Sequence, residues 1–559
     1  MKFDIKKWEY GMVLLSFFFI VSVMFLFWPA NTVLGGDDLG FHLNRILGLS
    51  DSLNQKNYPF YINAHFLNGY GYAANWFYPD LFLLPLAFYL KLGGSITLGY
   101  KVYLVVIQLL MVVSMYSCMY LLTKQKIISW LISWCYIFSS YRLIDHYVRG
   151  AVGENLAFLF YPLVVIGLYQ LLYKEQKNGL FFLAFGFTGL VYSHVLSVVM
   201  MSIIVAVFCA IRWKVFLRNP MILYYLGMSV GLTILLGAFS LFPMLEQMGA
   251  SNWYYQVHPF ANLSSSKGYS VTQFIVSLVK PYTTTPNFIV GIGAVPVILI
   301  FSRCFYKGKK TILNQFARSL LSIGLVFLLM TTSVFPIKWF SILDVIQFSW
   351  RLNAISTSLL VVSGGIYFSQ LEMKPLKKKF YFSVVGIFII LCLQIGQVNK
   401  EYQQKYAGVV DTYQGKNYVS QFSLGAGSEY LPATSSKEFI EHRGDKLVEL
   451  NTNQQVAYTR LSKGIQFSTD FGEQQLKKME LPLIWYKGYE ATLNGEKLPI
   501  EKNKIGLIQV DTQLKGTIQV YYKGTIIQKV AMIVSISTFL IMSGTFSYFK
   551  LRKVGEKWN

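Results

Sequence analysis

The chain carries Gly35-Gly36-Asp37-Asp38-Leu39-Gly40-Phe41-His42-Leu43-Asn44-Arg45 directly after its first apolar segment. The two glycines are expected to end the preceding helix, because glycine tolerates backbone conformations that other residues avoid. Asp37 or Asp38 can then cap a new helix. In that helix Asp38, His42 and Arg45 follow an i, i+4, i+7 spacing and share one face. The stretch therefore predicts a carboxylate, an imidazole and a guanidinium together at a membrane surface. The alternative is that the aspartates only cap the helix and that Arg45 only meets lipid phosphate.

The composition is that of an integral membrane protein. Hydrophobic residues make up 54% of the chain and charged residues 14%, and the mean hydropathy is +0.44. Many apolar runs reach the roughly 20 residues that a helix needs to cross a bilayer. The first run, Met12 to Trp28, lacks a small-residue cleavage site. We therefore expect a retained anchor and not a signal peptide.

The formal net charge of +23 comes from 50 Lys and Arg against 27 Asp and Glu. Much of the excess lies in short clusters between apolar runs, as the positive-inside rule predicts for cytoplasmic loops. This distribution indicates anionic lipid headgroups as partners, and no nucleic acid. The five cysteines lie in or at the ends of apolar runs without a Cys-Xaa-Xaa-Cys pair, so we expect neither disulfides nor a zinc site.

The basic clusters, beginning with Lys2, Lys6 and Lys7, predict about twelve spans with both termini in the cytoplasm. The spans are expected at Met12–Trp28, near 100–122, 127–141, 155–173, 221–242 and 527–549, in a hairpin with its outer tip at Tyr192-Ser193-His194, and four times between residues 286 and 397. Tyr78 to Leu90 is apolar but short and holds two prolines. We expect it to be a re-entrant or juxtamembrane helix.

Three regions follow from this organisation. Residues 1–397 form a transmembrane domain whose first outer loop covers 29–99, residues 398–526 form a β-rich extracytoplasmic domain, and residues 527–559 form a final transmembrane helix and a cytoplasmic tail. The β-rich prediction rests on partly alternating β-branched residues at Leu507–Asp511 and Thr517–Tyr521. Asn494-Gly495 is a hairpin turn signal.

The ionisable residues in or beside the spans gather on the predicted outer side, and such residues are usually functional. They are Asp37, Asp38, His42, Arg45, Asp80, Arg142, Asp145, His146, Arg149, Glu154, His194, Glu246 and Arg351. Chemistry on that side has no ATP and no nucleotide sugar. It must draw on a substrate that is already activated, such as a sugar on a polyprenyl phosphate.

Transfer of such a sugar needs few protein groups. A carboxylate takes the proton of the acceptor hydroxyl, and arginines or a metal neutralise the departing phosphate. Asp38 is the candidate for this base, and Asp37 is the alternative candidate. His42 is expected to orient the base. Arg149, Arg351 and Arg45 fit the phosphate site. Glu154 holds Arg149 or joins Asp37 in binding a divalent cation (Mg or Mn), while Arg142, His194 and Asp80 give support.

Structural explanations for these residues stay open. Arg142–Asp145 and Arg149–Glu154 can be interfacial salt bridges. His194 at a hairpin tip is more often a hydrogen-bonding group at a helix end. Arg351 can extend along the apolar surface to the interface, with Trp350 as an anchor.

The chain resembles the bacterial YfhO-like membrane proteins and the related group named after 6-pyruvoyl-tetrahydropterin synthase, both similar to the GT-C glycosyltransferase superfamily. The matching pieces are Asp38–Ile46, Asn68–Tyr72, Phe77–Asp80, Tyr141–Leu143, Tyr147–Gly150, Gly153-Glu154, Ser193-His194, Gln347–Arg351, Glu429–Pro432 and Tyr486–Tyr489. They span most of the chain in family order.

The resemblance implies a GT-C fold with an acidic catalytic motif in the first outer loop, which Asp38 matches. It implies a polyprenyl-phosphate sugar as donor, such as one on undecaprenyl phosphate, and a cell-envelope acceptor such as teichoic acid or another surface glycan. It also implies a bacterial plasma membrane. The Asp37-Asp38 doublet leaves the choice of base open, and Val195 stands where a polar residue is more usual.

The sequence thus predicts an inverting glycosyltransferase that works on the outer leaflet. One alternative is a transporter or flippase of lipid-linked saccharides, which would bind the same groups without a base. A second alternative is a non-catalytic scaffold for envelope assembly.

Overall fold

The computed structural model describes residues 7–29, 32–33, 35–258, 263–265, 268–280, 282–283, 289–306, 308, 310–371, 378–406, 413–414, 419–425, 428–469 and 476–555. Lys2 and Lys6, on which the predicted cytoplasmic N-terminus depends, lie outside these ranges. So do parts of the predicted loop 29–99 and of the predicted domain 398–526.

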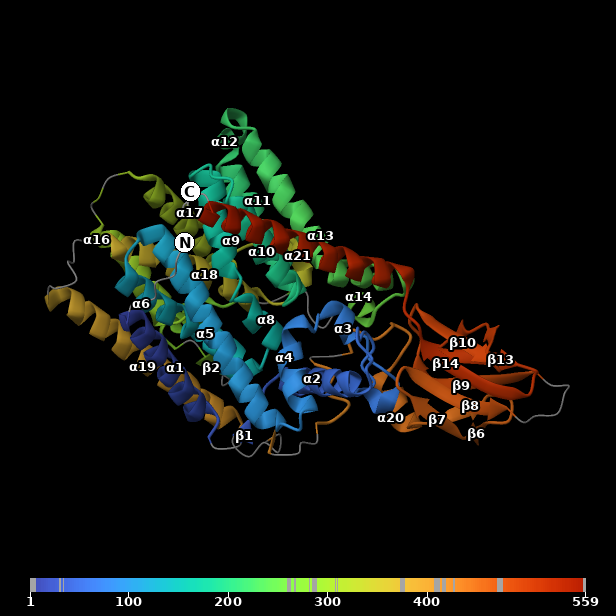
Figure 1. Cartoon of the computed structure of the whole chain (residues 1–559). Coiled ribbons are helices and arrows are strands. Elements are labelled where there is room, and N and C mark those ends of the chain that lie inside the picture. The colour runs from blue at the N-terminus through green and yellow to red at the C-terminus, as the bar shows by residue number, and fades with distance from the viewer. Residues whose placement is uncertain are drawn as a thin grey trace. The chain divides into compact units, whose positions relative to one another are not determined.

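The described residues are mostly helical and contain eight helices long and apolar enough to cross a membrane (Figure 1). They are α1 (Lys7–Phe27), α5 (Ile96–Thr123), the run of α8 (Val152–Ala157), α9 (Tyr161–Leu168) and η4 (Tyr169–Tyr173), α13 (Met221–Ala250), α17 (Ile312–Leu329), α18 (Leu352–Ser369) with η8 (Ser349–Arg351), α19 (Lys378–Tyr406) and α21 (Ile526–Gly555). The chain is therefore a multi-pass membrane protein.

A ninth span forms if α6 (Lys126–Ile137) continues into the helix Ser140–Arg149, from which it is bent by 52°. Three shorter apolar helices match the other predicted spans: α10 (Gly179–Val191), α11 (Val195–Ile211) and α16 (Ala294–Phe305). Each of the twelve predicted spans thus coincides with a helix or helix pair. The number that crosses the membrane stays a prediction.

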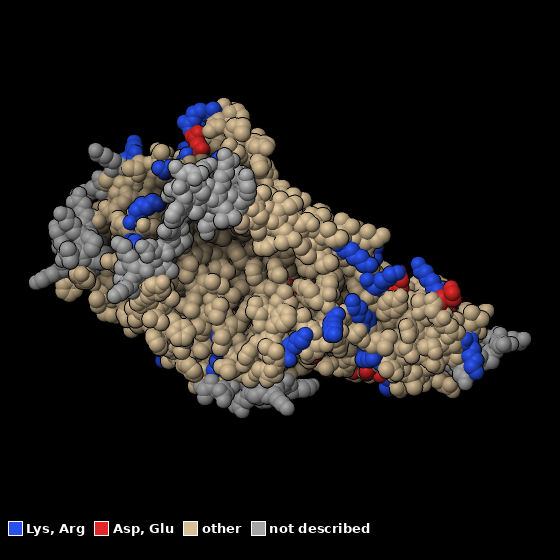
Figure 2. Space-filling model, viewed as in Figure 1, with Lys and Arg blue, Asp and Glu red and all other residues tan. Residues whose placement is uncertain are grey.

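Large apolar side chains are exposed along the long helices, as expected where lipid replaces water. Phe18 is 63% exposed, Leu223 59% and Ile541 66%. Figure 2 shows few charged residues over α13, while Lys and Arg gather over α12 (Trp213–Arg218). Soluble monomeric proteins rarely expose contiguous apolar surfaces along several helices.

The chain divides into two compact units. The first comprises residues 1–42, 93–229 and 261–418, and the second comprises 43–92, 230–260 and 419–559. The second unit joins the stretch after His42 to the β-rich region, a grouping that the sequence prediction, with its boundaries at 398 and 527, did not contain.

The first unit is built around α18, which is buried along its whole length. It packs against α16, α17 and α6. A side chain at Gly364 would come within 2.6 Å of Leu299 on α16, so the glycine allows these two helices to approach closely, as small residues do in membrane helix pairs.

The second unit contains two five-stranded antiparallel sheets (Figure 1). One has the order β11 (Glu496–Leu498), β10 (Tyr489–Leu493), β14 (Gly516–Tyr522), β8 (Gly464–Thr469), β7 (Tyr458–Leu461). The other has the order β12 (Glu501–Lys502), β13 (Leu507–Thr512), β9 (Lys477–Ile484), β5 (Leu447–Glu449), β6 (Gln454–Val456).

The sheet prediction is confirmed at several positions. The two predicted strands are β13 and β14, and buried Val520 and Ile518 lie opposite Ile465 and Phe467. Asn494-Gly495 forms the turn between β10 and β11, with φ of 53° and 93°. Two successive positive φ values are those of a type I′ hairpin turn.

The predicted helix after Gly35-Gly36 is also confirmed, as α2 (Leu39–Asn54). The short apolar stretch that follows contains η2 (Leu81–Leu83) and α4 (Leu84–Lys91), with Pro85 in its first turn, where proline is tolerated.

The stretch between the predicted spans 127–141 and 155–173 is helical in the structure. It begins as α7 (Ser140–Leu143) and continues as the π-helix η3 (Ile144–Arg149). Its side chains are buried, polar and apolar alike, so packing and not polarity decides its conformation. The helix ends at Gly150, whose φ is +66°.

Candidate active site

Three carboxylates meet at one arginine in the first unit. Nη1 of Arg149 lies 2.6 Å from Oδ1 of Asp145 and 2.7 Å from Oε2 of Glu154, and its Nη2 lies 3.4 Å from Oδ2 of Asp38. The side chain of Asp145 is fully buried and that of Glu154 nearly so, whereas that of Asp38 is 24% exposed. Asp38 is therefore the most accessible of these three carboxylates.

The backbone holds Asp38 against the end of η3. Its amide donates a 2.7 Å hydrogen bond to the carbonyl of Arg149. Glycines make this approach possible, because a side chain at Gly36 would meet the Arg149 carbonyl at 3.1 Å and one at Gly150 would meet Leu39 at 3.0 Å. Gly36 thus lets the aspartate approach η3. The prediction that the glycine doublet ends the preceding helix is wrong, because α1 ends at Phe27.

The far side of the cluster is aromatic. The hydroxyl of Tyr141 donates a 2.6 Å hydrogen bond to Oε1 of Glu154. The guanidinium of Arg149 lies 4.9 Å from the ring centre of Trp350, within the range of a cation–π contact. Both oxygens of Glu154 are therefore bonded, and Arg149 has little freedom to turn away from the carboxylates.

Arg351 stands next to this group and is less constrained than Arg149. Its Nη1 donates to Oε1 of Gln347 at 2.7 Å, and its guanidinium lies 5.5 Å and 5.8 Å from the rings of Phe348 and Trp350. It is close enough to Asp38 to interact electrostatically. Its Nε is buried without a hydrogen-bond partner among the described residues.

Burial raises the pKa of Asp38 above its usual value near 3.8. The nearby charges of Arg149 and Arg351 oppose this shift, and those of Asp37 and Glu154 add to it. A carboxylate with a raised pKa takes up a proton more readily near neutral pH than an ordinary aspartate does.

Asp37 has different partners. Its Oδ1 lies 2.6 Å from Nζ of Lys405 and 3.1 Å from the hydroxyl oxygen of Tyr406, which shares its one proton between this carboxylate and the carbonyl of Val148 at 3.0 Å. Asp37 thus ties the loop to the end of α19. Asp37 and Asp38 thus differ in the residues that they contact, and the sequence did not reveal this difference.

The histidines near the cluster are buried. His42 lies in the first turn of α2, with its ring centre 5.0 Å from that of Phe41 and its amide donating to the carbonyl of Asp38. Nδ1 of His194 lies 2.9 Å from Oγ of Ser197 at the start of α11. Burial lowers the pKa of His194 to about 4. A hydrogen-bonding role at a helix end fits these contacts.

Arg142 is fully buried and bonds neutral groups. Its Nη1 donates to Oε1 of Gln108 at 3.2 Å and to the carbonyl of Ile137 at 3.0 Å, and its Nη2 lies 3.0 Å from Nδ1 of His146. Arg142 thus joins α7 to α5 and η3, and Asp145, its partner in the structural explanation, pairs with Arg149 instead.

Arg45 and Asp80 belong to the second unit. Nη2 of Arg45 donates to the carbonyl oxygens of Tyr78 at 2.6 Å and Pro79 at 3.1 Å. Burial raises the pKa of Asp80 to about 6, and the charge of Arg45 opposes that shift. These two residues therefore lie beside each other.

The carboxylates do not fit the metal that the sequence suggested. Within the described ranges no group of three or more His, Cys, Asp and Glu is placed to hold an ion. Asp37 bonds Lys405 and Tyr406, whereas Glu154 bonds Arg149 and Tyr141. All five cysteines are free.

Comparisons with known proteins give similarities in sequence and in structure. No protein-family model matches the chain. The chain is 24% identical, over 612 aligned positions that cover 98% of both chains, to a Lactococcus lactis subsp. cremoris (strain MG1363) protein described as uncharacterized. It is also similar to the single-particle cryo-EM structure of the arabinofuranosyltransferase AftD from Mycobacteria, with a TM-score of 0.43 and 11% identity. That match covers 72% of this chain and 27% of the mycobacterial one, so the chain spans about a quarter of that protein.

Proposed function

We propose that the chain is a membrane glycosyltransferase of the GT-C type that moves a sugar from a polyprenyl-phosphate donor to a cell-envelope glycan. The observation that carries this proposal is the carboxylate of Asp38. It is partly exposed, its pKa is raised by burial, and two arginines stand beside it. This combination provides a base for a hydroxyl group next to cations suited to a phosphate.

The proposed reaction is a single displacement. Asp38 takes the proton of an acceptor hydroxyl while that oxygen attacks the anomeric carbon of the sugar. The bond between the anomeric carbon and the phosphate oxygen breaks, and polyprenyl phosphate leaves with the bonding electrons. The product has inverted configuration at the anomeric carbon. A positioned base of this kind contributes roughly 10²- to 10⁴-fold to such a rate.

The two arginines take different parts in this proposal. Arg149 is shared by three carboxylates, so we assign it to positioning Asp38. Among the described residues, Arg351 donates a hydrogen bond to the neutral side chain of Gln347 and forms no ion pair within 4 Å. We therefore assign it to the donor phosphate, where its remaining donors can bind the developing negative charge. Glu154 and Tyr141 act through Arg149 and hold it in place.

One observation favours the transporter alternative. The helix pair over Lys126–Arg149 is bent by 52°, and its second part carries the buried charges of Arg142, Asp145 and Arg149. Interrupted helices with charged residues at the break also form substrate sites in transporters. Such a protein would not need Asp38 as a base.

A transfer assay in detergent-permeabilised membranes separates the two functions, because permeabilisation makes transport unnecessary. Membranes from a deletion strain and from the complemented strain would be supplied with a radiolabelled polyprenyl-phosphate sugar, and label in the envelope glycan would be counted. A transferase predicts incorporation only in the complemented membranes. Equal incorporation without the protein would overturn the proposal and favour the transporter.

A further inference from the structure

The second unit contains a cavity whose lining includes none of the residues proposed for catalysis. It has a volume of about 410 Å³, within the range of roughly 300–1,000 Å³ that is usual for small-molecule sites. Its walls come from the segment between α2 and α4, the strands β7, β8, β9, β10 and β14, and the first turns of α21.

The lining combines aromatic rings with positive charge. Phe60, Tyr61, Tyr489 and Tyr522 contribute the rings, and Arg460, Lys463, Lys523 and Lys529 contribute the cations. No Asp or Glu is among the described residues that line the cavity. This excess of positive charge favours an anionic ligand.

Two of the four cations are already occupied. Arg460 bonds Asp445 and donates to the carbonyls of Asn68 at 2.9 Å and Gly69 at 2.8 Å. Lys523 pairs with Glu490 at 2.9 Å. These two side chains therefore form part of the cavity wall, and their charges are already neutralised by carboxylates of the protein.

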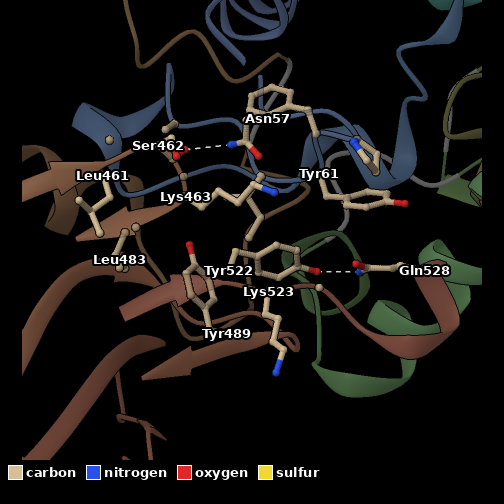
Figure 3. A pocket seen from close by; sticks show the side chains of 18 of the residues that line it. Asn57, Tyr61, Leu461, Ser462, Lys463, Leu483, Tyr489, Tyr522, Lys523 and Gln528 are labelled. Atoms are coloured by element: carbon tan, nitrogen blue, oxygen red, sulfur yellow. Dashed lines mark hydrogen bonds between the residues drawn. The ribbon is translucent and has the colours of Figure 1, made fainter. Parts of the chain in front are cut away.

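Lys463 and Lys529 are the available cations. Neither has a carboxylate within ion-pairing distance in the part of the chain that the structure describes. Figure 3 shows Lys463 extending between Asn57 and the ring of Tyr522, whereas Lys523 points away from them. The amine of Lys463 thus faces the interior of the cavity.

The rings give the cavity a rigid apolar face. Tyr489 and Tyr522 pack edge to face with ring centres 5.2 Å apart, and the hydroxyl of Tyr522 accepts a 2.6 Å hydrogen bond from Gln528 and donates to the carbonyl of Lys487 at 3.2 Å (Figure 3). Tyr61 stacks on Trp76 at 6.2 Å. Fixed rings beside polar groups suit the apolar face of a sugar ring, since both surfaces are flat and amphipathic.

We infer that this cavity binds a negatively charged saccharide, with Lys463 and Lys529 on its acidic groups and the tyrosine rings on its sugar faces. Lys529 lies near the start of α21, a candidate span, so the ligand meets the protein at a membrane–water boundary. Naming this saccharide as the acceptor rests on the proposed function; the binding itself does not.

The test measures binding without transfer, so its failure is separate from a failure of the proposed function. Full-length protein in detergent micelles would be titrated with dye-labelled tetragalacturonate as the anionic probe and with maltotetraose as the neutral one, using microscale thermophoresis. We expect tetragalacturonate to bind at least tenfold more tightly than maltotetraose, and its affinity to fall as salt is added.

Three variants identify the site. Lys463→Gln and Lys529→Gln should each weaken tetragalacturonate binding about fivefold, a loss of about 1 kcal/mol. Lys497→Gln on β11 removes the same charge outside the cavity and should leave binding unchanged. All three positions are exposed, so an unchanged melting temperature is expected and would show that folding is intact.

Two results would overturn the inference. The first is equal binding of both probes, or equal loss in Lys497→Gln and Lys463→Gln. The second is binding of vesicles of phosphatidylglycerol, but not of phosphatidylcholine, by a protein that binds neither saccharide. That result would make the cavity a site for lipid headgroups.

Discussion

At the scale of residues, the candidate site is one arginine shared among three carboxylates. Removing a partner from a buried ion pair leaves an uncompensated charge and costs several kcal/mol, so Arg149, Asp145 and Glu154 are expected to be required for folding. Asp38 is the exception, because its carboxylate is partly exposed and lies farther from the Arg149 guanidinium than the carboxylates of Asp145 and Glu154 do. Substitutions at Asp38 therefore report on chemistry more than on stability.

Arg351 should set the pH at which Asp38 becomes active. The base must be ionised, so the rate falls as the pH drops through the pKa of Asp38. The positive charge of Arg351 lowers that pKa. Arg351→Gln should therefore raise the pKa of Asp38 and move the acidic limb of the rate profile to higher pH, by about one unit or less.

The profile would be measured by sugar transfer in permeabilised membranes across the acidic range. Arg303→Gln on α16 is the matched control, since it removes the same charge from an exposed position. A limb that stays in place in Arg351→Gln would show that Asp38 is not the titrating base.

Asp80 should make stability depend on pH. Burial raises its pKa from 3.8 to about 6 in the folded chain. Between these two values the folded state binds more protons than the unfolded state, so the free energy of unfolding falls as the pH rises. The difference of about two units corresponds to at most about 3 kcal/mol.

Asp80→Asn should remove this dependence and raise the melting temperature at pH 7 but not at pH 4. Asp51→Asn is the control, because the side chain of Asp51 is 60% exposed. Melting curves of the purified protein that keep the same pH slope in Asp80→Asn would contradict the account.

The local spacing of the opening stretch predicts only part of its environment. Asp38, His42 and Arg45 follow a helical spacing, and the helix is there. Yet Asp38 meets Arg149 from another segment, while Arg45 meets Tyr78 and Pro79 in the second unit. Spacing along one helix fixes which residues share a face, whereas tertiary packing chooses their partners. Lys405 and Tyr406, more than 360 residues from Asp37, gave no signal in the sequence for this reason.

At the scale of elements, two glycines fit the loop of Asp38 against the end of η3. Gly150 ends the helix with a positive φ, which glycine adopts readily. Gly36 has no side chain, and this allows the backbone of Arg149 to approach. The π-helix that precedes Gly150 is a rare element that often marks functional sites. The position of Asp38, the proposed base, thus depends on backbone features outside the charged cluster.

Gly150→Ala and Gly36→Ala should each displace Asp38 from Arg149. We expect a loss of stability of about 1 kcal/mol or more at Gly150, and at least tenfold slower transfer in both variants, since a shift of about 1 Å can cost a hundredfold in rate. Gly227→Ala on α13 is the control, because a side chain there meets nothing within 4 Å. Full activity in Gly36→Ala would show that the close approach is not required.

Helices, strands and turns could be predicted from the sequence where the local residues alone determine the backbone conformation. Asn494-Gly495 forms its hairpin because two successive residues with positive φ suit that dipeptide. The helix from Ser140 to Arg149 was not predicted, because its polar residues Arg142, Asp145 and His146 interrupt the apolar pattern. Those residues bond one another and neighbouring helices inside the protein, and such buried polar networks leave no periodic signature.

At the scale of the whole molecule, the proposed chemistry requires the β-rich region and the loop of Asp38 to face outward. The positive-inside pattern predicts this orientation. It also predicts that the basic cluster beginning at Arg303 is cytoplasmic. The discontinuous second unit was not predictable, since contacts such as that of Arg460 with the carbonyl of Gly69 join segments 391 residues apart.

The orientation can be tested with a membrane-impermeant maleimide in intact cells. Glu496→Cys in the exposed β11 should be labelled without permeabilisation. The native, exposed Cys304 should be labelled only after permeabilisation, which makes it an internal control. Mass spectrometry of the peptides would read both sites. The reverse pattern would place the β-rich region in the cytoplasm and exclude outer-leaflet transfer.

The central claim is that Asp38 is the base, and the envelope glycan composition of complemented deletion strains tests it most directly. Wild type, Asp38→Asn and Asp37→Asn would be expressed in the deletion strain at equal levels in the membrane, as checked by immunoblot. The account predicts that one sugar is lost on deletion and returns with wild type. That sugar should stay absent with Asp38→Asn and return in large part with Asp37→Asn, whose carboxylate is tied to Lys405. Full recovery with Asp38→Asn would contradict the account.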